Sequence, residues 1–295
     1  MRNTCLEQVY ELAKRDSRVV FIGSDLGAGV LQKFKAEMLD RFFMEGIQEQ
    51  NIIGMAAGMA LEGKIVYVNT IATFLTRRCF EQIAVDVCLH NLNVRLIGNG
   101  GGLVYAPLGP THMAIEDIAL MRSLPNMTIL APADAEEMHF EMVTRADHRG
   151  PLYIRLARGG DPIVTHGIFP VGLDVLLVTT GITLGLAREA AKLIPSCTIL
   201  HIPRIKPFNL AMFHIYAERA RVIISIEEHS IIGGLGSACA EAIAEAGFFP
   251  AKRFKRIGIP DVFPDRYGSQ AELLEYYKIT SSNIVSTAIQ LLGRS

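Results

Sequence analysis

Residues 45–63 read EGIQEQNIIGMAAGMALEG, and the assignment of the rest of the chain depends on this stretch. No charged residue occurs from position 52 to 61, a pattern typical of a helix that is buried on all sides. Gly54 and Gly58 share one helix face, and each weakens a helix by roughly 1 kcal/mol relative to alanine. We therefore expect another backbone or a ligand to pack closely against this face. The carboxylate of Glu49 either caps the first helical turn or awaits a partner, because a buried unpaired charge is costly.

The segment from Gly46 to Asn51, followed by the segment from Gly54 to Gly58, resembles the pyrimidine-domain motif of the transketolase family of thiamine-diphosphate enzymes. This resemblance implies that Glu49 contacts N1′ of the cofactor's aminopyrimidine ring. A carboxylic acid at that nitrogen favours the imino tautomer, whose 4′-nitrogen takes the proton from C2 of the thiazolium ring. The resemblance thus implies that Glu49 is both catalytic and cofactor-binding.

The chain has 295 residues, half of them hydrophobic, and a formal net charge of −1. This length accommodates two domains, and the balanced charge gives no indication of a nucleic-acid partner. The five cysteines form no C-x-x-C pair or Cys/His cluster, which fits reduced thiols in the cytoplasm. We expect a soluble cytoplasmic protein with no signal peptide and no membrane association. The N-terminal segment lacks a long apolar core, and no apolar run reaches about 20 residues.

Short apolar segments alternate with helical patterns along the chain, which predicts an α/β fold with doubly wound sheets. The predicted strands are at residues 18–23, 41–44, 64–69, 93–98, 127–130, 152–156, 174–179, 197–202 and 222–226. The glycine- and proline-rich stretch 158–172 is a linker candidate. The resemblance divides the chain into a pyrimidine-binding domain at 1–165 and a transketolase C-terminal domain at 172–295.

A second candidate segment, residues 73–82, reads TFLTRRCFEQ and follows a predicted strand, where α/β proteins bind their ligands. Phe74 and Phe80 are by residue type alone ordinary core candidates. The resemblance implies that Phe74 packs on the aminopyrimidine and that Phe80 also belongs to the cofactor site. Arg77 and Arg78 suit either a solvated turn or a bidentate phosphate contact. Resemblance to the related 1-deoxyxylulose-5-phosphate synthases implies that Arg78 binds substrate.

The segment from Gly109 to His112 resembles the G-P-T-H motif of transketolases, whose histidine lies beside the reacting carbons. A lone histidine is otherwise a satisfied loop or core residue. The resemblance implies that His112 is catalytic and contacts substrate, and histidine suits proton transfer near neutral pH. Leu108 replaces the aspartate that precedes this motif in transketolases, and Gly100 falls where they have a histidine. These departures predict altered recognition of ketose hydroxyls, and a less hydroxylated donor fits them.

Arg158 follows a predicted strand, and the resemblance implies that it binds a substrate phosphate, whereas by position alone it is equally a linker arginine. The segment 227–238 resembles the C-terminal-domain signature of the family, a domain that the resemblance assigns to structure and dimer formation. The sequence has no G-D-G segment followed by paired asparagines, and no acidic pair indicates a metal site. The resemblance therefore implies that a partner polypeptide binds the diphosphate and its Mg²⁺ or Ca²⁺.

These features predict the C-terminal subunit of a split transketolase-like enzyme. It would transfer a two-carbon ketol or related acyl unit from a donor to an aldehyde. The donor would be a ketose, for example a sugar phosphate, or a 2-oxo acid. Its partner would be an N-terminal transketolase-like subunit with the diphosphate-binding domain. Two copies of this chain would also associate with each other through both of their domains, which gives an α2β2 complex. Two alternatives stay open, namely the β subunit of a 2-oxo-acid dehydrogenase E1 and a non-catalytic paralogue that only dimerises.

Overall fold

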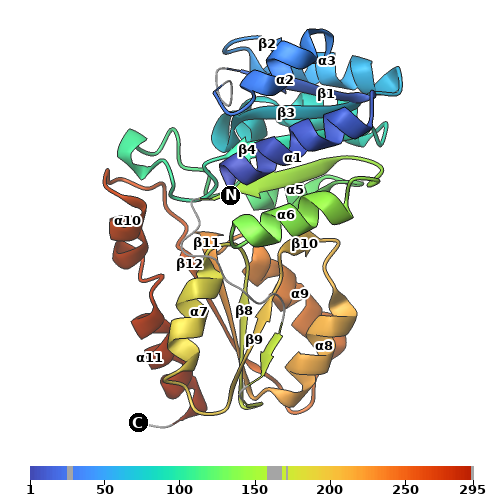
Figure 1. Cartoon of the computed structure of the whole chain (residues 1–295). Coiled ribbons are helices and arrows are strands. Elements are labelled where there is room, and N and C mark those ends of the chain that lie inside the picture. Colours follow the sequence, from blue (N-terminus) through green and yellow to red (C-terminus); the bar gives the residue numbers. More distant parts are fainter. Residues whose placement is uncertain (25–28, 158–167, 171, 294–295) are drawn as a thin grey trace.

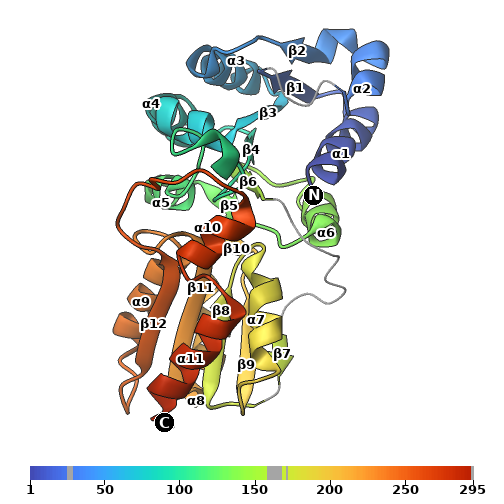
Figure 2. The ribbon, with the colours of Figure 1, turned by 90° about the vertical axis from the view of Figure 1, so that its left-hand side faces the viewer.

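The structure is a computed structural model that describes residues 1–24, 29–157, 168–170 and 172–293. Two β-sheets form two layered bodies, and helices cover both faces of each sheet (Figure 1 and, after a quarter turn, Figure 2). The predicted α/β class with two doubly wound sheets is confirmed, since the strand pairs are parallel except for one pair at an edge of each sheet. Among the described residues, no helix has the length and apolarity required to span a bilayer.

The first sheet has the strand order β10-β5-β6-β4-β3-β1-β2. Its central strands are rich in valine and isoleucine and are buried on both faces, as expected for parallel strands between two helix layers. The strands of this sheet are β1 (Val19–Gly23), β2 (Phe42–Met44), β3 (Ile65–Ile71), β4 (Val94–Asn99), β5 (Thr128–Leu130), β6 (Leu152–Leu156) and β10 (Arg204–Lys206).

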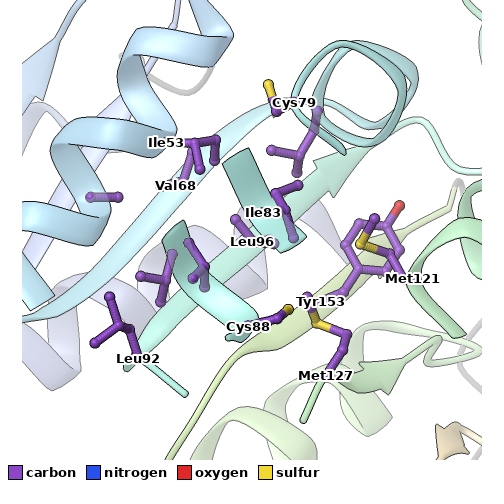
Figure 3. Packing of buried hydrophobic residues seen from close by; sticks show 14 of the residues in the cluster. Ile53, Val68, Cys79, Ile83, Cys88, Leu92, Leu96, Met121, Met127 and Tyr153 are labelled. Carbon is purple, nitrogen blue, oxygen red and sulfur yellow. The ribbon is translucent and has the colours of Figure 1, made fainter. Parts of the chain in front are cut away.

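Two groups of helices cover this sheet. One face packs against α3 (Glu49–Leu61), the helical segment η2 (Phe74–Arg78), α4 (Phe80–Gln82) and η3 (Ile83–Cys88), and α5 (Asp117–Ser123). The other face packs against α1 (Arg2–Arg15), α2 (Gln32–Glu37) and α6 (Ala135–Thr144), and a short turn η1 (Leu39–Arg41) precedes β2. Figure 3 shows Ile53 and Ile83 pointing from their helices toward Val68 and Leu96 of the sheet. The segment from η2 to η3 is helical along most of its length, and η2 and η3 are π-helical stretches on either side of α4.

Helix α3 is buried on one side only, which corrects the expectation of a helix buried on all sides. The side chains of Ile52, Ile53 and Ala56 are fully buried, whereas Gly54 and Gly58 are exposed. Outside the helix's own backbone, no described atom lies within 4 Å of a Cβ placed on either glycine. The close neighbour expected from the glycine spacing is therefore not part of the described chain, and this helix face is open.

The second sheet has the strand order β12-β11-β8-β9-β7. Its strands are β7 (Ile168–Pro170), β8 (Val175–Thr179), β9 (Cys197–His201), β11 (Val222–Ser230) and β12 (Arg253–Ile259). The helices α7 (Thr183–Ala191), α10 (Gln270–Tyr276) and α11 (Ser281–Leu292) cover one face, and α8 (Leu210–Arg219) and α9 (Leu235–Ala246) cover the other.

The two halves of the chain are joined by more than a linker. Strand β10 comes from the second half but extends the first sheet, where it pairs antiparallel with β5. The amide of Ala131 donates to the carbonyl of Pro203 at 2.7 Å. The buried imidazole of His201 lies 3.0 Å from the carboxylate of Glu137. The division of the chain at residues 165 and 172 stays a prediction. It did not anticipate that β10, from the second half, would join the sheet of the first half.

Candidate active site

Three predicted site residues follow β2, β3 and β4 of the first sheet, which together with β1 form one half of that sheet. Glu49 begins α3 just after β2, Phe74 begins η2 just after β3, and His112 lies in the loop 100–116 after β4. The segments that follow parallel strands converge at one edge of such a sheet, which is where open α/β sheets bind their ligands. The fold therefore carries these three side chains to the same edge.

Glu49 and Phe74 are linked by one arginine. The carboxylate of Glu49 is only 5% exposed, and its Oε2 lies 3.2 Å from Nη1 of Arg78. The guanidinium carbon of Arg78 lies 3.9 Å from the centre of the Phe74 ring. Both residues belong to the π-helical turn η2, and turns of this kind occur often at functional sites. The carboxylate thus has a cationic partner in addition to its place in the first turn of α3, where a negative charge is favourable.

His112 contacts the same aromatic ring. Its imidazole meets the Phe74 ring edge-on, with 5.0 Å between the ring centres. Nδ1 of His112 lies 2.9 Å from the hydroxyl of Thr111. The carboxylate, the aromatic ring and the imidazole predicted from sequence therefore form one contiguous cluster through Phe74 and Arg78.

The contacts of Arg78 give a test of whether a flat aromatic ring such as an aminopyrimidine suits these residues. A guanidinium is flat and carries N–H donors, so it can stack on a ring and donate to a carboxylate at the same time. An aminopyrimidine is also flat, so it would stack on Phe74 in the same way, and its ring nitrogen would share a proton with the carboxyl group of Glu49. The side chain of Arg78 is 47% exposed, so it can leave this position without unpacking the core. The donor set therefore suits the ring, provided that Arg78 moves.

The start of the loop 100–116 has no room for additional side chains. A Cβ on Gly100, where φ is +77°, would lie 2.1 Å from the ring of Tyr105. A Cβ on Gly102, where φ is +71°, would lie 2.5 Å from the carboxyl carbon of Glu228. Leu108, in the short turn η4 (Ala106–Leu108), is 51% exposed. The two positions that differ from the family pattern thus present no hydrogen-bonding side chain at this edge.

The other predicted site residues have different surroundings. Phe80 packs against the core of the first sheet and lines a cavity of about 780 Å³. Arg77 lines the same cavity and forms an ion pair with Glu116, and Phe263 of the second half forms part of the wall. A cofactor contact of Phe80 stays a prediction. Arg158 lies outside the described residues, and its phosphate contact also stays a prediction.

A buried charged network behind the loop was missed by the sequence reasoning. Nε of Arg155 and the hydroxyl of Tyr153 each donate to Oδ2 of Asp117 at 2.7 Å. Nη2 of Arg155 donates to the carbonyls of Ala114 at 3.2 Å and Glu228 at 2.9 Å. Burial, reinforced by the adjoining carboxylate of Asp117, raises the pKa of Tyr153 well above its ordinary value. The sequence does contain one indication of this network, namely an arginine inside the otherwise apolar strand LYIRL. A charge buried in such a strand requires a partner of opposite charge.

The triplet Glu227, Glu228 and His229 at the end of β11 is also buried. Burial raises the pKa of Glu227 to about 7 and also raises the pKa of Glu228, although hydrogen-bond donors and Arg155 oppose both shifts. Burial lowers the pKa of His229, so the neutral imidazole is favoured. All three shifts have the same cause, because a dry environment disfavours the charged form of each group.

The described residues contain no group of three or more His, Cys, Asp or Glu side chains arranged to hold a metal ion. At the candidate site they provide one carboxylate, one aromatic ring, one imidazole and one guanidinium. Such a set suits ring stacking and proton transfer, whereas Mg²⁺ prefers several oxygen ligands.

Comparisons with known proteins agree with one another. The transketolase pyrimidine binding domain model matches residues 1–160, and the transketolase C-terminal domain model matches residues 170–284. A Methanocaldococcus jannaschii protein, provisionally named a transketolase C-terminal section, is 34% identical over 98% of this chain and 95% of its own length. The 6-deoxy-6-sulfo-D-fructose transketolase subunit of Clostridium sp. strain MSTE9 is 31% identical over 100% of this chain and 95% of its own length. A solved split-gene transketolase, described as an inactive β4 tetramer, superimposes with a TM-score of 0.88 at 34% identity, covering 99% of this chain and 98% of that chain.

Proposed function

Because the chain belongs to the transketolase family, we propose that it is the C-terminal subunit of a split enzyme that uses thiamine diphosphate to transfer a two-carbon ketol unit. The observation that carries this proposal is the cluster of Glu49, Phe74 and His112 at one edge of the first sheet. The relatives named above support the split arrangement, because a C-terminal section and a split-gene transketolase each match this chain over nearly their whole length.

The residues of this chain would hold the pyrimidine half of the cofactor. When bound, thiamine diphosphate supplies the nucleophilic carbon and the electron sink that cleave a carbon–carbon bond next to a carbonyl group. Phe74 offers its ring face to the aminopyrimidine. Glu49, nearly buried at the start of α3, shares a proton with a ring nitrogen. Burial keeps water from competing for that proton, which strengthens the hydrogen bond.

His112 and Arg78 would face the substrate. The imidazole of His112, fixed edge-on against Phe74, holds or moves a proton at a hydroxyl or carbonyl oxygen of the sugar. Arg78, once displaced from Glu49, carries its guanidinium to a substrate phosphate. Gly100 and Leu108 offer that substrate no hydrogen bond, so we propose a donor with fewer hydroxyl groups, or differently placed ones, than an ordinary ketose. The final acceptor is an aldehyde.

The partner would be an N-terminal transketolase section that binds the diphosphate and its Mg²⁺. The donor set of the described residues has no oxygen cluster for that metal, so the task falls to the partner. The open glycine face of α3 is a candidate contact within an α2β2 assembly. We also propose that the complex works in the cytoplasm.

The catalytic assignment is tested with Glu49→Gln, assayed in the complex with the N-terminal section. Loss of a positioned proton-transfer group lowers turnover by about 10²- to 10⁴-fold. The matched control is Glu7→Gln, an exposed glutamate of α1 on the opposite face of the sheet, which leaves turnover unchanged. Full activity of Glu49→Gln would refute the assignment. Transfer from pyruvate to a lipoyl acceptor by the native complex would instead favour a 2-oxo-acid dehydrogenase.

A further inference from the structure

The loop 100–116, which carries His112, is held in part by the second half of the chain. Within the first half, the amide of Gly102 donates to the carbonyl of Ala114 at 2.9 Å and closes the loop at its base. From the second half, the amide of Ser230 at the end of β11 donates to the carbonyl of Ile115 at 2.7 Å. A strand of the second sheet therefore fixes the segment just after His112.

Glu228, two residues before the end of β11, fixes the other side of the loop. Its Oε1 accepts a hydrogen bond from the amide of Leu103 at 2.9 Å and another from Nε2 of Gln270 at 2.7 Å. Leu103 is fully buried, so its amide has no water to replace this carboxylate. The contact is tight, because only a glycine at position 102 leaves space for the carboxyl group.

The neighbouring residue Glu227 is equally buried but has a different task. Its two carboxylate oxygens accept hydrogen bonds from the amides of Leu235 at 2.7 Å and Gly236 at 2.8 Å. Both amides belong to the first turn of α9, within the second half of the chain. Two adjacent buried glutamates of one strand thus serve different segments: Glu227 holds a helix of its own half, and Glu228 holds the loop of the other half.

We propose that Glu228 is a positioning residue, whose carboxylate fixes Leu103 and thereby holds the loop that presents His112 to the substrate. The inference rests on the proposed function for the role of His112, but the fixing of the loop can be measured independently. A displacement of a reacting group by about 1 Å costs roughly 100-fold in rate, so loosening this loop is expected to reduce turnover.

The test compares Glu228→Met with Glu227→Met, which is the same substitution at the adjacent buried position. Glu228→Gln is the rescue variant, because its amide oxygen can accept the bonds from Leu103 and Gln270. Its nitrogen takes the place of Oε2, which has no hydrogen-bond partner among the described residues. Should Glu228→Met fail to fold, Gln270→Ala is the second variant, since it removes a neighbour of the carboxylate at a half-buried position.

The amide hydrogen exchange of residues 103–112 and the melting temperature are measured on the full chain, and kcat and KM are measured in the complex. We expect Glu228→Met to speed exchange of the Leu103 amide about 10-fold or more and to lower kcat by about 10- to 100-fold, with KM within about threefold. Glu228→Gln restores most of kcat. Glu227→Met lowers the melting temperature but keeps exchange in the loop and kcat near the native values.

Equal losses of kcat in the two methionine variants, in step with their melting temperatures, would overturn the proposal, because Glu228 would then be merely structural. An unchanged exchange rate of Leu103 in Glu228→Met would overturn it as well. If the native complex transfers no ketol unit at all, the proposed function fails, and the exchange rates still decide whether Glu228 fixes the loop.

Discussion

The buried pair of Asp117 and Arg155 gives the sharpest prediction about stability. The substitution Asp117→Asn keeps the shape but removes the charge that faces a guanidinium with only 3% of its side chain exposed. Removal of one partner from a buried ion pair costs about 3–5 kcal/mol, because the other charge stays buried without compensation. The carbonyls of Ala114 and Glu228 still accept bonds from Arg155, so we expect the lower end, about 3 kcal/mol. Tyr153→Phe removes one hydrogen bond to the same carboxylate and costs about 1 kcal/mol.

The assay is urea denaturation followed by far-ultraviolet circular dichroism, which reports the free energy of unfolding. The control is Glu189→Gln, which breaks an exposed ion pair with Lys192 and changes that free energy by less than about 0.5 kcal/mol. A loss of about 3 kcal/mol is a large part of the 5–15 kcal/mol of a typical domain, so it is readily measured. A loss in Asp117→Asn no larger than that of the control would refute the reasoning.

Three further predictions follow from buried groups. Gly102→Ala places a Cβ against the carboxyl group of Glu228 at a φ of +71°, so we expect a loss of about 1–3 kcal/mol in the free energy of unfolding, read from urea denaturation, and faster amide exchange in the loop 100–116. Because burial raises the pKa of Glu227 to about 7 from an ordinary 4.5, folding favours its protonated form. The resulting stabilisation, at most about 3.5 kcal/mol at about 1.4 kcal/mol per unit of pKa, is complete below about pH 4.5 and absent above about pH 7. Glu227→Gln should flatten stability over that pH window, and an unchanged slope would contradict the assignment. The five cysteines are buried, and burial raises the pKa of Cys79 to about 12, so iodoacetamide should label them only after unfolding, as mass spectrometry would show.

Apolar runs located the central strands well, because a parallel strand between two helix layers is apolar along its whole length. The predictions at 18–23 and 152–156 correspond to β1 and β6 within a residue. Strands β7 and β10 were missed because each has only three residues and forms at a sheet edge, where pairing with a distant segment decides the conformation. Strand β12 was missed because charged residues interrupt its sequence RFKRIGI, and only Ile257 and Ile259 of this strand are buried.

The sequence allowed the position of a candidate site residue to be predicted where that residue directly follows a strand. Glu49, Phe74 and His112 each follow one, so the topology brings them together once the strand order is known. The contact of Arg78 with Glu49 could not be predicted, because it depends on a π-helical turn. The open face of α3 was mistaken for a buried one, since an apolar sequence does not tell whether the covering surface belongs to the same chain. The link between Leu103 and Glu228 joins segments far apart in sequence and left no local pattern.

The most direct test of the central claim is isothermal titration calorimetry with thiamine diphosphate and Mg²⁺. The titration is made on this chain alone, and then on its mixture with a transketolase N-terminal section from the same organism. Our account predicts no measurable binding by the chain alone and clear binding by the mixture, with weaker binding when the chain carries Phe74→Ala. Tight binding by this chain alone would contradict the account, because a complete diphosphate and metal site would then exist without a partner.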